Sequence, residues 1–205
     1  MTRIVGRYAI CDEITAGGMA NLHLGRLLGP VGFSRTVAVK RLHPQYARDP
    51  AFASSMLDEA RLVSRVKHLN VVPILDVIST GSELLLVMDY VHGESLATLL
   101  RNASERPPVA VVLAVLAGVL HGLHPAHVAR DEQGMPLGLV HRDVSPQNIM
   151  GGTDGLPRIL DFGIAKAHGR TQTTEDGQLK GKLGYMAPEQ FSSADIDRRV
   201  DVYAA

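Results

Sequence analysis

Residues 139–152, LVHRDVSPQNIMGG, place a histidine, an arginine, an aspartate, a Ser-Pro pair and an asparagine between two apolar runs. Asp143 and Asn148 stand five positions apart, and Pro146 stiffens the backbone between them. A step of this length in a short loop lets a carboxylate and an amide oxygen converge on one point. Convergent oxygens suit the binding of a hydroxyl group or a hard cation. Taken by itself, however, the stretch can equally be an ordinary polar loop. The rest of the chain has to decide between these interpretations.

Composition indicates an ordinary globular protein. The 205 residues are 45% hydrophobic and 20% charged, with a formal net charge of +0, enough for one large domain or two small lobes. This balance gives no sign of bulk binding to nucleic acid or to an anionic membrane surface. The one cysteine, Cys11, excludes an internal disulfide, fits a reducing compartment, and is predicted to be buried in its apolar stretch. The N-terminus lacks a signal-peptide pattern, so we expect a cytoplasmic protein.

The most apolar run is VAVVLAVLAGVL, residues 109–120. It is shorter than the roughly 20 residues that span a bilayer, so we predict a buried helix and no membrane segment. His121, His124 and His127 follow at intervals of three, but the third residue drifts around the helix. We therefore favour packing and helix-end roles for these histidines over zinc binding.

The two halves of the chain differ in their predicted secondary structure. Five short apolar runs in the first 90 residues predict strands: RYAICDEI, ANLHLGRLL, TVAVKRL, VVPILDVIS and LLLVMDYV. Between the third and fourth, apolar residues from Phe52 to Val66 recur with a helical period. The second half predicts mainly helix and loop, with a surface hairpin or loop at 130–138.

Further polar positions lie between the predicted strands. Gly17 and Gly18 separate two strands, where backbone amides can approach phosphate oxygens, although a plain hairpin turn explains them as well. A dinucleotide-binding turn would need a helix directly afterwards, and a strand follows instead. Lys40 ends the next strand, and Glu59 lies on an apolar helix face where an unpaired carboxylate would be costly. Lys40 is the candidate partner of Glu59.

Asp161 in ILDFGIAK and the later GYMAPEQ complete an ordered set. A glycine loop, Lys, Glu, Asp and Asn, Asp-Phe-Gly and Ala-Pro-Glu in this order form the protein-kinase signature. From about Arg7 to its last residue, the chain resembles the eukaryotic-like Ser/Thr protein kinases of bacteria. The resemblance implies an α+β, two-lobed kinase fold. Residues 1–91 would form the N-lobe, an antiparallel sheet with one main helix, and 92–205 a mainly helical C-lobe that is incomplete at its C-terminal end.

The resemblance also implies ATP and Mg²⁺ as cofactors and protein Ser/Thr hydroxyls as acceptors. Lys40 would contact the α- and β-phosphates and pair with Glu59, while Asn148 and Asp161 would hold Mg²⁺. Asp143 would accept or orient the proton of the substrate hydroxyl. Around the nucleotide, the resemblance implies phosphate contacts from Gly17 and Gly18, a gatekeeper at Met88, hinge contacts from the backbone of Asp89 and Val91, and adenine packing by Ile14, Leu22, Ala38 and Met150.

The chain departs from the family pattern at a few positions. Thr15 and Ala20 replace the usual first and third glycines of the loop. Ser145 stands at a position where the family usually has lysine, and Lys182 stands where it usually has threonine. We therefore expect that the two positions have exchanged their functional groups, which keeps one ammonium and one hydroxyl beside Asp143. A nucleotide-binding regulatory module with little turnover remains the alternative to an active kinase.

The resemblance makes two further predictions. Arg142 would pair with a phosphorylated residue among Thr171, Thr173 and Thr174, which implies self-association for autophosphorylation. Asp201 matches the residue that braces the catalytic-loop backbone. Since family domains continue beyond this point, we expect a fragment with exposed apolar faces on the 109–120 helix and at Val200, Val202 and Tyr203.

Overall fold

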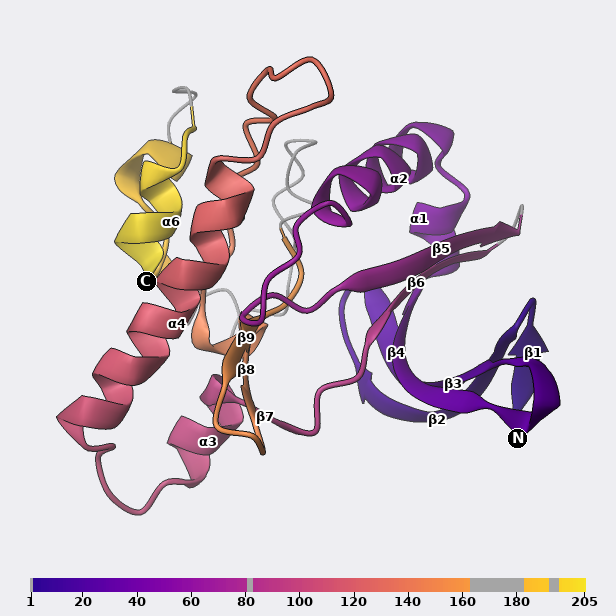
Figure 1. Cartoon of the computed structure of the whole chain (residues 1–205), viewed down its shortest axis with the longest axis horizontal. Helices are drawn as coiled ribbons and strands as arrows, with labels where there is room; N and C mark the ends of the chain where they lie inside the picture. Colours follow the sequence, from indigo (N-terminus) through magenta and orange to yellow (C-terminus); the bar gives the residue numbers. More distant parts are fainter. Residues whose placement is uncertain (1, 81–82, 163–182, 192–195) are drawn as a thin grey trace. The chain divides into compact units, whose positions relative to one another are not determined.

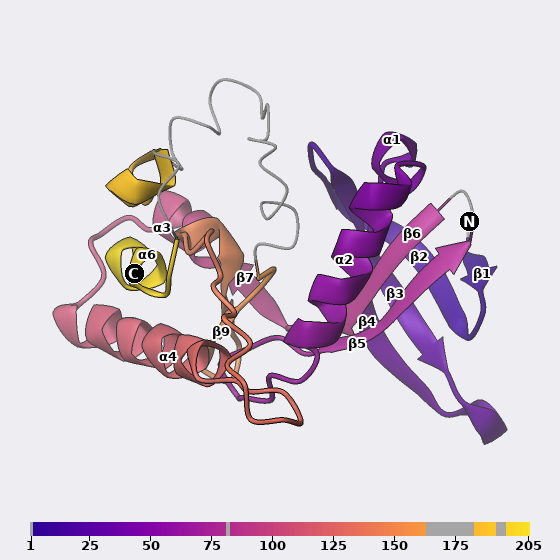
Figure 2. The ribbon, with the colours of Figure 1, turned by 90° about the horizontal axis from the view of Figure 1, so that it is seen from above.

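The computed structural model describes residues 2–80, 83–162, 183–191 and 196–205 (Figures 1 and 2). The chain divides into two compact units. Unit 1 comprises residues 1–64 and 73–90, and unit 2 comprises residues 65–72 and 91–205.

Unit 1 is built on a six-stranded antiparallel sheet with the strand order β1-β2-β3-β4-β6-β5. The strands are β1 (Arg3–Val5), β2 (Tyr8–Ala16), β3 (Ala20–Leu28), β4 (Ser34–Leu42), β5 (Ile74–Thr80) and β6 (Glu83–Asp89). All five predicted strands are therefore present, and β1 is an additional one. A short 3-10 turn, Pro30–Gly32, joins β3 to β4.

The strand register separates two kinds of side chain onto the two faces of this sheet. Leu22 pairs with Lys40, and Ala38 pairs with Met88. Because directly paired and alternate residues share a face, these four side chains lie on one side of the sheet. The intervening residues form the core cluster on the other side, whose buried members are Val5, Tyr8, Ile10, Val37, Val39, Leu85 and Val87. The residues predicted to contact the nucleotide are thus kept apart from this core.

The predicted helix of unit 1 is α2 (Pro50–Val63), preceded by the short α1 (Pro44–Ala47). Asp49 caps α2, since its carboxylate accepts hydrogen bonds from the backbone N–H groups of Ala51 and Phe52. Pro50 then occupies the first turn, where no N–H donor is needed. The buried residues are Phe52, Met56, Ala60 and Val63, which confirms the helical period read from the sequence.

Unit 2 combines a small sheet with several helices. Its strands β7 (Gly93–Ser95), β8 (Ile149–Gly152) and β9 (Pro157–Ile159) are antiparallel, and its helices are α3 (Leu96–Asn102), α4 (Val109–His127) and α6 (Arg199–Ala204). The core joins Val119 and Leu123 of α4 to Val144, Ile149 and Ile159. This core packs the end of α4 against the segment that contains residues 141–148.

Residues 65–72 group with unit 2 because they pair with β9. Asn70 O accepts the N–H of Ile159 at 2.8 Å, and Ile159 O accepts the N–H of Val72 at 3.0 Å. The Asn70 side chain also donates to Pro157 O at 2.7 Å.

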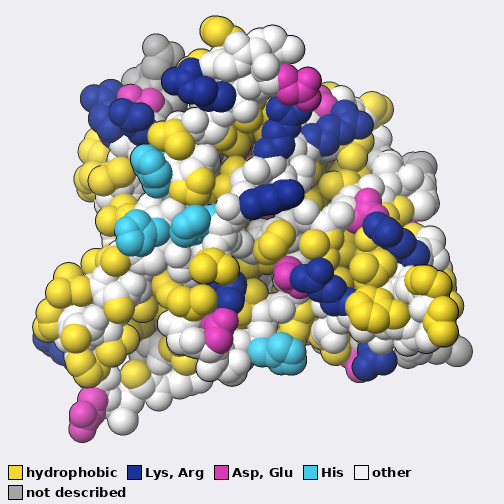
Figure 3. Space-filling model, in the orientation of Figure 1, with side chains coloured by type: hydrophobic (Ala, Val, Ile, Leu, Met, Phe, Trp, Pro, Cys, Tyr) yellow, Lys and Arg dark blue, Asp and Glu magenta, His cyan; other side chains and the backbone are white. Residues whose placement is uncertain are grey.

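Helix α4 is only partly buried, which contradicts the prediction of a buried helix but agrees with the exposed apolar face expected on residues 109–120. Val109, Val111, Val112 and Leu113 are exposed, and only the second half, at Val119, Gly122, Leu123 and Ala126, is buried. It has 19 residues and ends at His127, and it is the one helix among the described residues whose length and composition would permit a membrane span. Figure 3 shows apolar side chains gathered over the first turns of α4.

An apolar groove of about 320 Å³ lies within unit 2 between α3, α4 and the end of α6. Of the three C-terminal residues expected to be exposed, Val202 and Tyr203 are exposed but Val200 is buried. Cys11 is half-buried rather than buried. The predicted hairpin at 130–138 is present, closed by an antiparallel bridge between Arg130 and Pro136.

The contact between α4 and Asn70 generates a stability prediction. A Cβ atom on Gly122 would lie 2.7 Å from Asn70 O and 3.1 Å from Ile159 Cδ1. We expect Gly122→Ala to lower the free energy of unfolding by about 1–3 kcal/mol through overpacking, although alanine favours a helix by about 1 kcal/mol over glycine. Urea denaturation measures the change, with exposed His121→Ala on the same helix as control. Stabilisation by Gly122→Ala would contradict the packing described above.

Candidate active site

The loop from His141 to Asn148 brings together the two side chains from which the sequence interpretation started. Residues Pro146–Asn148 form a 3-10 turn, closed by a bond from the N–H of Asn148 to Ser145 O. The Asn148 side-chain Nδ2 donates to Asp143 O at 2.7 Å and to Asp143 Oδ2 at 2.9 Å. The five-residue step therefore does place the amide against the carboxylate. Because a backbone carbonyl can only accept, these bonds assign the NH₂ group of Asn148 to Asp143.

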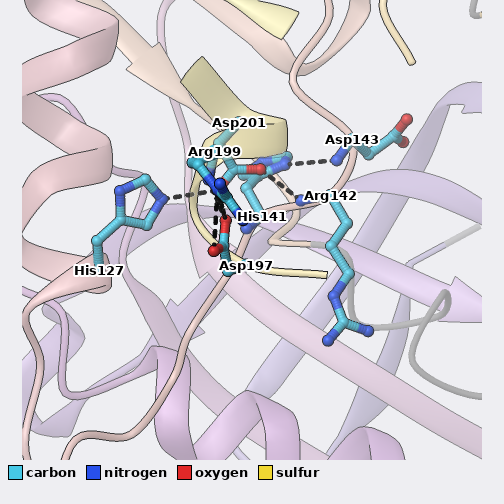
Figure 4. Close-up of polar contacts among 7 residues, drawn as sticks. All are labelled: His127, His141, Arg142, Asp143, Asp197, Arg199 and Asp201. Atoms are coloured by element: carbon cyan, nitrogen blue, oxygen red, sulfur yellow. Dashed lines mark hydrogen bonds and ion pairs between the residues drawn. The ribbon is translucent and has the colours of Figure 1, made fainter. Parts of the chain in front are cut away.

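Asp201 of α6 holds the backbone of this loop (Figure 4). Its carboxylate accepts from the N–H groups of His141 and Arg142, both at 2.7 Å, and lies 2.7 Å from His127 Nε2. The residue is fully buried, so its charge depends on these partners. The bracing role predicted for Asp201 is confirmed, whereas the contribution of His127 from α4 was not foreseen.

Arg142 adopts a left-handed backbone conformation, with φ of 61°. This region is unfavourable for a residue with a Cβ atom, by about 1–2 kcal/mol, and persists only where its surroundings impose it. The Arg142 guanidinium extends away from the His127–Asp201 contact (Figure 4). The threonines proposed as its phosphorylated partners, Thr171, Thr173 and Thr174, lie outside the described residues.

His141 is buried beneath the loop with both ring nitrogens in use. Its Nε2 lies 2.7 Å from Leu160 O, and its Nδ1 accepts the N–H of Asp143 at 3.2 Å. A carbonyl oxygen requires a donor and an N–H group requires an acceptor, so the ring is neutral with its proton on Nε2. Burial lowers the pKa of His141. The hydrogen bond to Leu160 O and the nearby carboxylates of Asp201, Asp143 and Asp161 only partly oppose that shift.

Leu160 connects the loop to the Asp-Phe-Gly segment. Its N–H donates to Asn148 O at 2.8 Å, and its carbonyl is the acceptor for His141. Asp161 follows with a left-handed φ of 49°, and the buried Phe162 ring packs against His141 with centroids 4.9 Å apart. Asn148 and Asp161 are therefore positioned by one continuous set of backbone bonds.

The donor atoms at this point fit a hard cation. With the NH₂ group of Asn148 turned to Asp143, the amide offers its Oδ1 atom, and Asp161 offers a carboxylate. Oxygen ligands of this kind suit Mg²⁺, which commonly takes only one or two protein side chains and fills its shell with phosphate and water oxygens. Among the described residues, no group of three or more histidine, cysteine or acidic side chains is arranged so that it could hold a metal ion by itself.

Unit 1 carries the other predicted residues. Lys40 and Leu22 are cross-strand neighbours on the face opposite the core, and Glu59 lies on α2. The glycine loop forms a tight turn, closed by the bond from the N–H of Gly17 to Ala20 O at 3.1 Å, and includes Gly18. The predicted gatekeeper Met88 is buried, whereas the adenine-packing candidate Ile14 is exposed.

The remaining candidates lie near the boundary of the units and in unit 2. The N–H of Asp89 donates to Pro73 O at 3.0 Å, so a hinge contact from this residue would have to come from its carbonyl. Val91 belongs to unit 2, and Met150 lies on β8 beside Ser95. Ser145 is buried, and its Oγ has no hydrogen-bond partner among the described residues. Lys182, its proposed counterpart, lies outside them.

Comparison with known proteins settles the family. A model of the protein kinase domain matches residues 31–205. The chain belongs to the protein kinase family. This kinase chain is 42% identical over 202 residues to the tyrosine-protein kinase MasK of Myxococcus xanthus, and 37% identical over 198 residues to the serine/threonine-protein kinase PknL of Mycobacterium tuberculosis. Each alignment covers 97% of this chain but 31% and 47% of the relatives, so the chain spans about a third to a half of their length.

Solved structures agree with the kinase fold. The crystal structure of the Mycobacterium tuberculosis PknI kinase domain, in its C20A mutant, superposes with a TM-score of 0.71 at 28% sequence identity. That comparison covers 97% of this chain and 70% of the PknI chain. The prediction of an α+β kinase fold, with an antiparallel N-lobe sheet, is confirmed.

The neutral, buried His141 generates a prediction about pH. The unfolded chain protonates this histidine near its ordinary pKa of about 6.5, whereas the folded protein takes up the proton only at a lower pH. The contribution of the neutral His141 ring to the free energy of unfolding is therefore complete above about pH 6.5 and decreases as the pH falls below that value. The decrease is up to about 1.4 kcal/mol per pH unit until the pH reaches the pKa of His141 in the folded protein.

Denaturation midpoints of the wild type and His141→Phe, followed across this range, isolate the effect from that of the other histidines. We expect the variant to be less stable at pH 7 but to lose less stability on acidification. Parallel pH profiles would show that His141 is not the group responsible.

Proposed function

We propose that this chain carries the catalytic machinery of a protein kinase that transfers the γ-phosphoryl group of ATP to Ser or Thr hydroxyls of proteins. The observation that carries the proposal is the contact between Asn148 and Asp143, in a loop whose backbone is held by the buried Asp201. Phosphoryl transfer depends on positioning and charge neutralisation more than on covalent help, and a fixed carboxylate beside a metal-binding amide meets that need.

The catalytic loop would act on the acceptor. Asp143 accepts or orients the proton of the substrate hydroxyl, and its carboxylate is kept in place by the Asn148 NH₂ group. Asn148 Oδ1 and the Asp161 carboxylate would hold Mg²⁺ beside the phosphates. The metal, when bound, neutralises charge on the phosphate oxygens.

The residues of unit 1 would bind the nucleotide. Lys40 contacts the α- and β-phosphates and is oriented by Glu59, while the turn at Gly17 and Gly18 presents backbone N–H groups to the phosphates. Apolar side chains would pack against the adenine ring, namely Ile14, Leu22, Ala38 and Met150, with Met88 as the gatekeeper and hinge contacts at Asp89 and Val91. Support comes from the sheet register, which places Leu22, Ala38, Lys40 and Met88 on one face.

Ser145 and Lys182 form the second part of the proposal. The buried Ser145 hydroxyl lacks a partner among the described residues, and it stands two positions after Asp143. In the active kinase, Lys182 supplies the ammonium group beside Asp143 that other Ser/Thr kinases obtain from the position of Ser145.

The acceptor is the point on which the relatives differ. PknL is named a serine/threonine kinase and MasK a tyrosine kinase, and MasK has the higher identity of the two. We favour Ser/Thr because the SPQN sequence resembles the loop of that class, and tyrosine is the second candidate. Autophosphorylation between two copies, at Thr171, Thr173 or Thr174, would supply the phosphate that Arg142 binds.

A regulatory module that binds ATP with little turnover is the alternative of a different class. The substitutions Thr15 and Ala20 in the glycine loop favour it, since they reduce the conformational freedom of the phosphate-binding turn.

Transfer of radiolabelled phosphate from ATP to a generic protein substrate separates these possibilities. We expect clear transfer by the wild type and a loss of kcat by a factor of about 10²–10⁴ in Asp143→Asn, because the amide can no longer accept the hydroxyl proton. The exposed Asp12→Asn serves as the matched control and should retain activity.

Phosphoamino-acid analysis of the product identifies the acceptor. Phosphoserine or phosphothreonine is the expected result, and phosphotyrosine alone would move this kinase to the acceptor class of MasK. ATP binding by the wild type without any transfer would overturn the kinase proposal in favour of the regulatory module.

A further inference from the structure

Gln190 links the Ala-Pro-Glu segment to the catalytic loop. It lies in the 3-10 turn Pro188–Phe191, and its side chain is half-buried. Its Nε2 donates to the carbonyl oxygen of Arg142 at 3.1 Å, and its Oε1 accepts the N–H of Ala187 at 3.0 Å. Ala187 is three positions from Gln190 but Arg142 is 48 positions away, so this one side chain joins its own turn to a distant part of unit 2.

Chemistry fixes the orientation of the Gln190 amide. The Arg142 carbonyl can only accept and the Ala187 N–H can only donate, so the amide nitrogen must face the first and the amide oxygen the second. A further bond from the Gln190 N–H to Ala187 O, at 2.9 Å, closes the turn and holds the backbone from which the side chain extends. Ala187 itself is fully buried. The amide is thus presented to Arg142 by a constrained turn.

The peptide group that receives this bond is the one that joins Arg142 to Asp143. Its carbonyl oxygen is held by Gln190, and its N–H donates to His141 Nδ1. On the other side of Arg142, the N–H is held by Asp201. Arg142 is in the left-handed region, where a rotation of the following peptide group would relieve strain and would redirect the Asp143 side chain.

We propose that Gln190 is a positioning residue, which fixes the peptide group before Asp143 and thereby couples the segment at residues 183–191 to the orientation of the catalytic carboxylate. This proposal rests on the kinase function proposed above. Gln190 does not touch the reacting atoms. It acts through the Arg142 carbonyl, on the side of the peptide that Asp201 does not reach.

Two substitutions change this contact in different ways. Gln190→Glu keeps the size of the side chain and the acceptor for Ala187, but it turns an acceptor toward the Arg142 carbonyl. Gln190→Met keeps the length and removes both hydrogen bonds. Gln133→Glu makes the same chemical change at an exposed position in the 130–138 hairpin and serves as the control.

Steady-state kinetics with ATP and a generic protein substrate give the first readout. We expect Gln190→Glu to lower kcat about tenfold or more at pH 8, because one hydrogen bond is lost and two acceptor oxygens then face each other. The KM for ATP should stay within about twofold of the wild-type value. Gln190→Met should lower kcat less. The control should match the wild type.

The pH profile of Gln190→Glu gives a signature that general loss of stability would not produce. A protonated carboxyl group regains an O–H donor for the Arg142 carbonyl. The ratio of wild-type to variant kcat should therefore shrink as the pH falls from about 8 to about 5.5, toward the carboxyl pKa, and the same ratio for Gln190→Met should stay constant.

Amide hydrogen exchange supplies a readout that is independent of activity. We expect faster exchange at residues 141–144 in Gln190→Glu than in the wild type and in Gln133→Glu. Unchanged exchange together with unchanged kcat would overturn the proposal. A wild type without phosphate transfer would refute the kinase function, and the exchange data alone would then decide whether Gln190 fixes the loop.

Discussion

The loop from His141 to Asn148 depends on one buried carboxylate. Arg142 must adopt a backbone conformation that costs about 1–2 kcal/mol for an ordinary residue, and the Asp201 carboxylate compensates through two backbone N–H groups and His127. Hydrogen bonds to a charged group are worth roughly 1.5–3 kcal/mol each, so the two from the loop N–H groups together exceed the cost of the turn. Asp143, Asn148 and Asp161 are placed by the backbone that this carboxylate fixes.

Much of the architecture could be predicted because it follows from short-range patterns. Branched apolar runs gave five strands, a helical period gave α2, and the five-residue step correctly brought Asn148 to Asp143. The missed contacts that hold the loop at residues 141–148 depend on residues distant in sequence. Nothing local distinguishes His127 from its two neighbours in the His121 series, or Gln190 from any polar residue after Ala-Pro-Glu.

Helix α4 shows why apolar composition alone misjudged burial. The apolar composition of residues 109–120 shows that this helix could be buried, but not which part of it is. The core of unit 2 contacts only the second half of α4, at Val119 and Leu123. The grouping of residues 65–72 with unit 2 has a similar origin. It arises from backbone pairing of Asn70 and Val72 with Ile159, which leaves no trace in the composition of the segment.

The separation along the chain between Asp201 and the loop that it holds has a consequence for synthesis. His141 and Asp201 are 60 positions apart, so the loop leaves the ribosome well before the carboxylate that imposes its shape. Until that point the left-handed turn at Arg142 has no compensation, and the nascent segment can relax to an extended backbone. The strands of unit 1, which precede the loop, can pair earlier because domains fold from the N-terminus as they emerge. The Asp143 carboxylate is therefore oriented only after Asp201 has emerged, when the strands of unit 1 can already be paired.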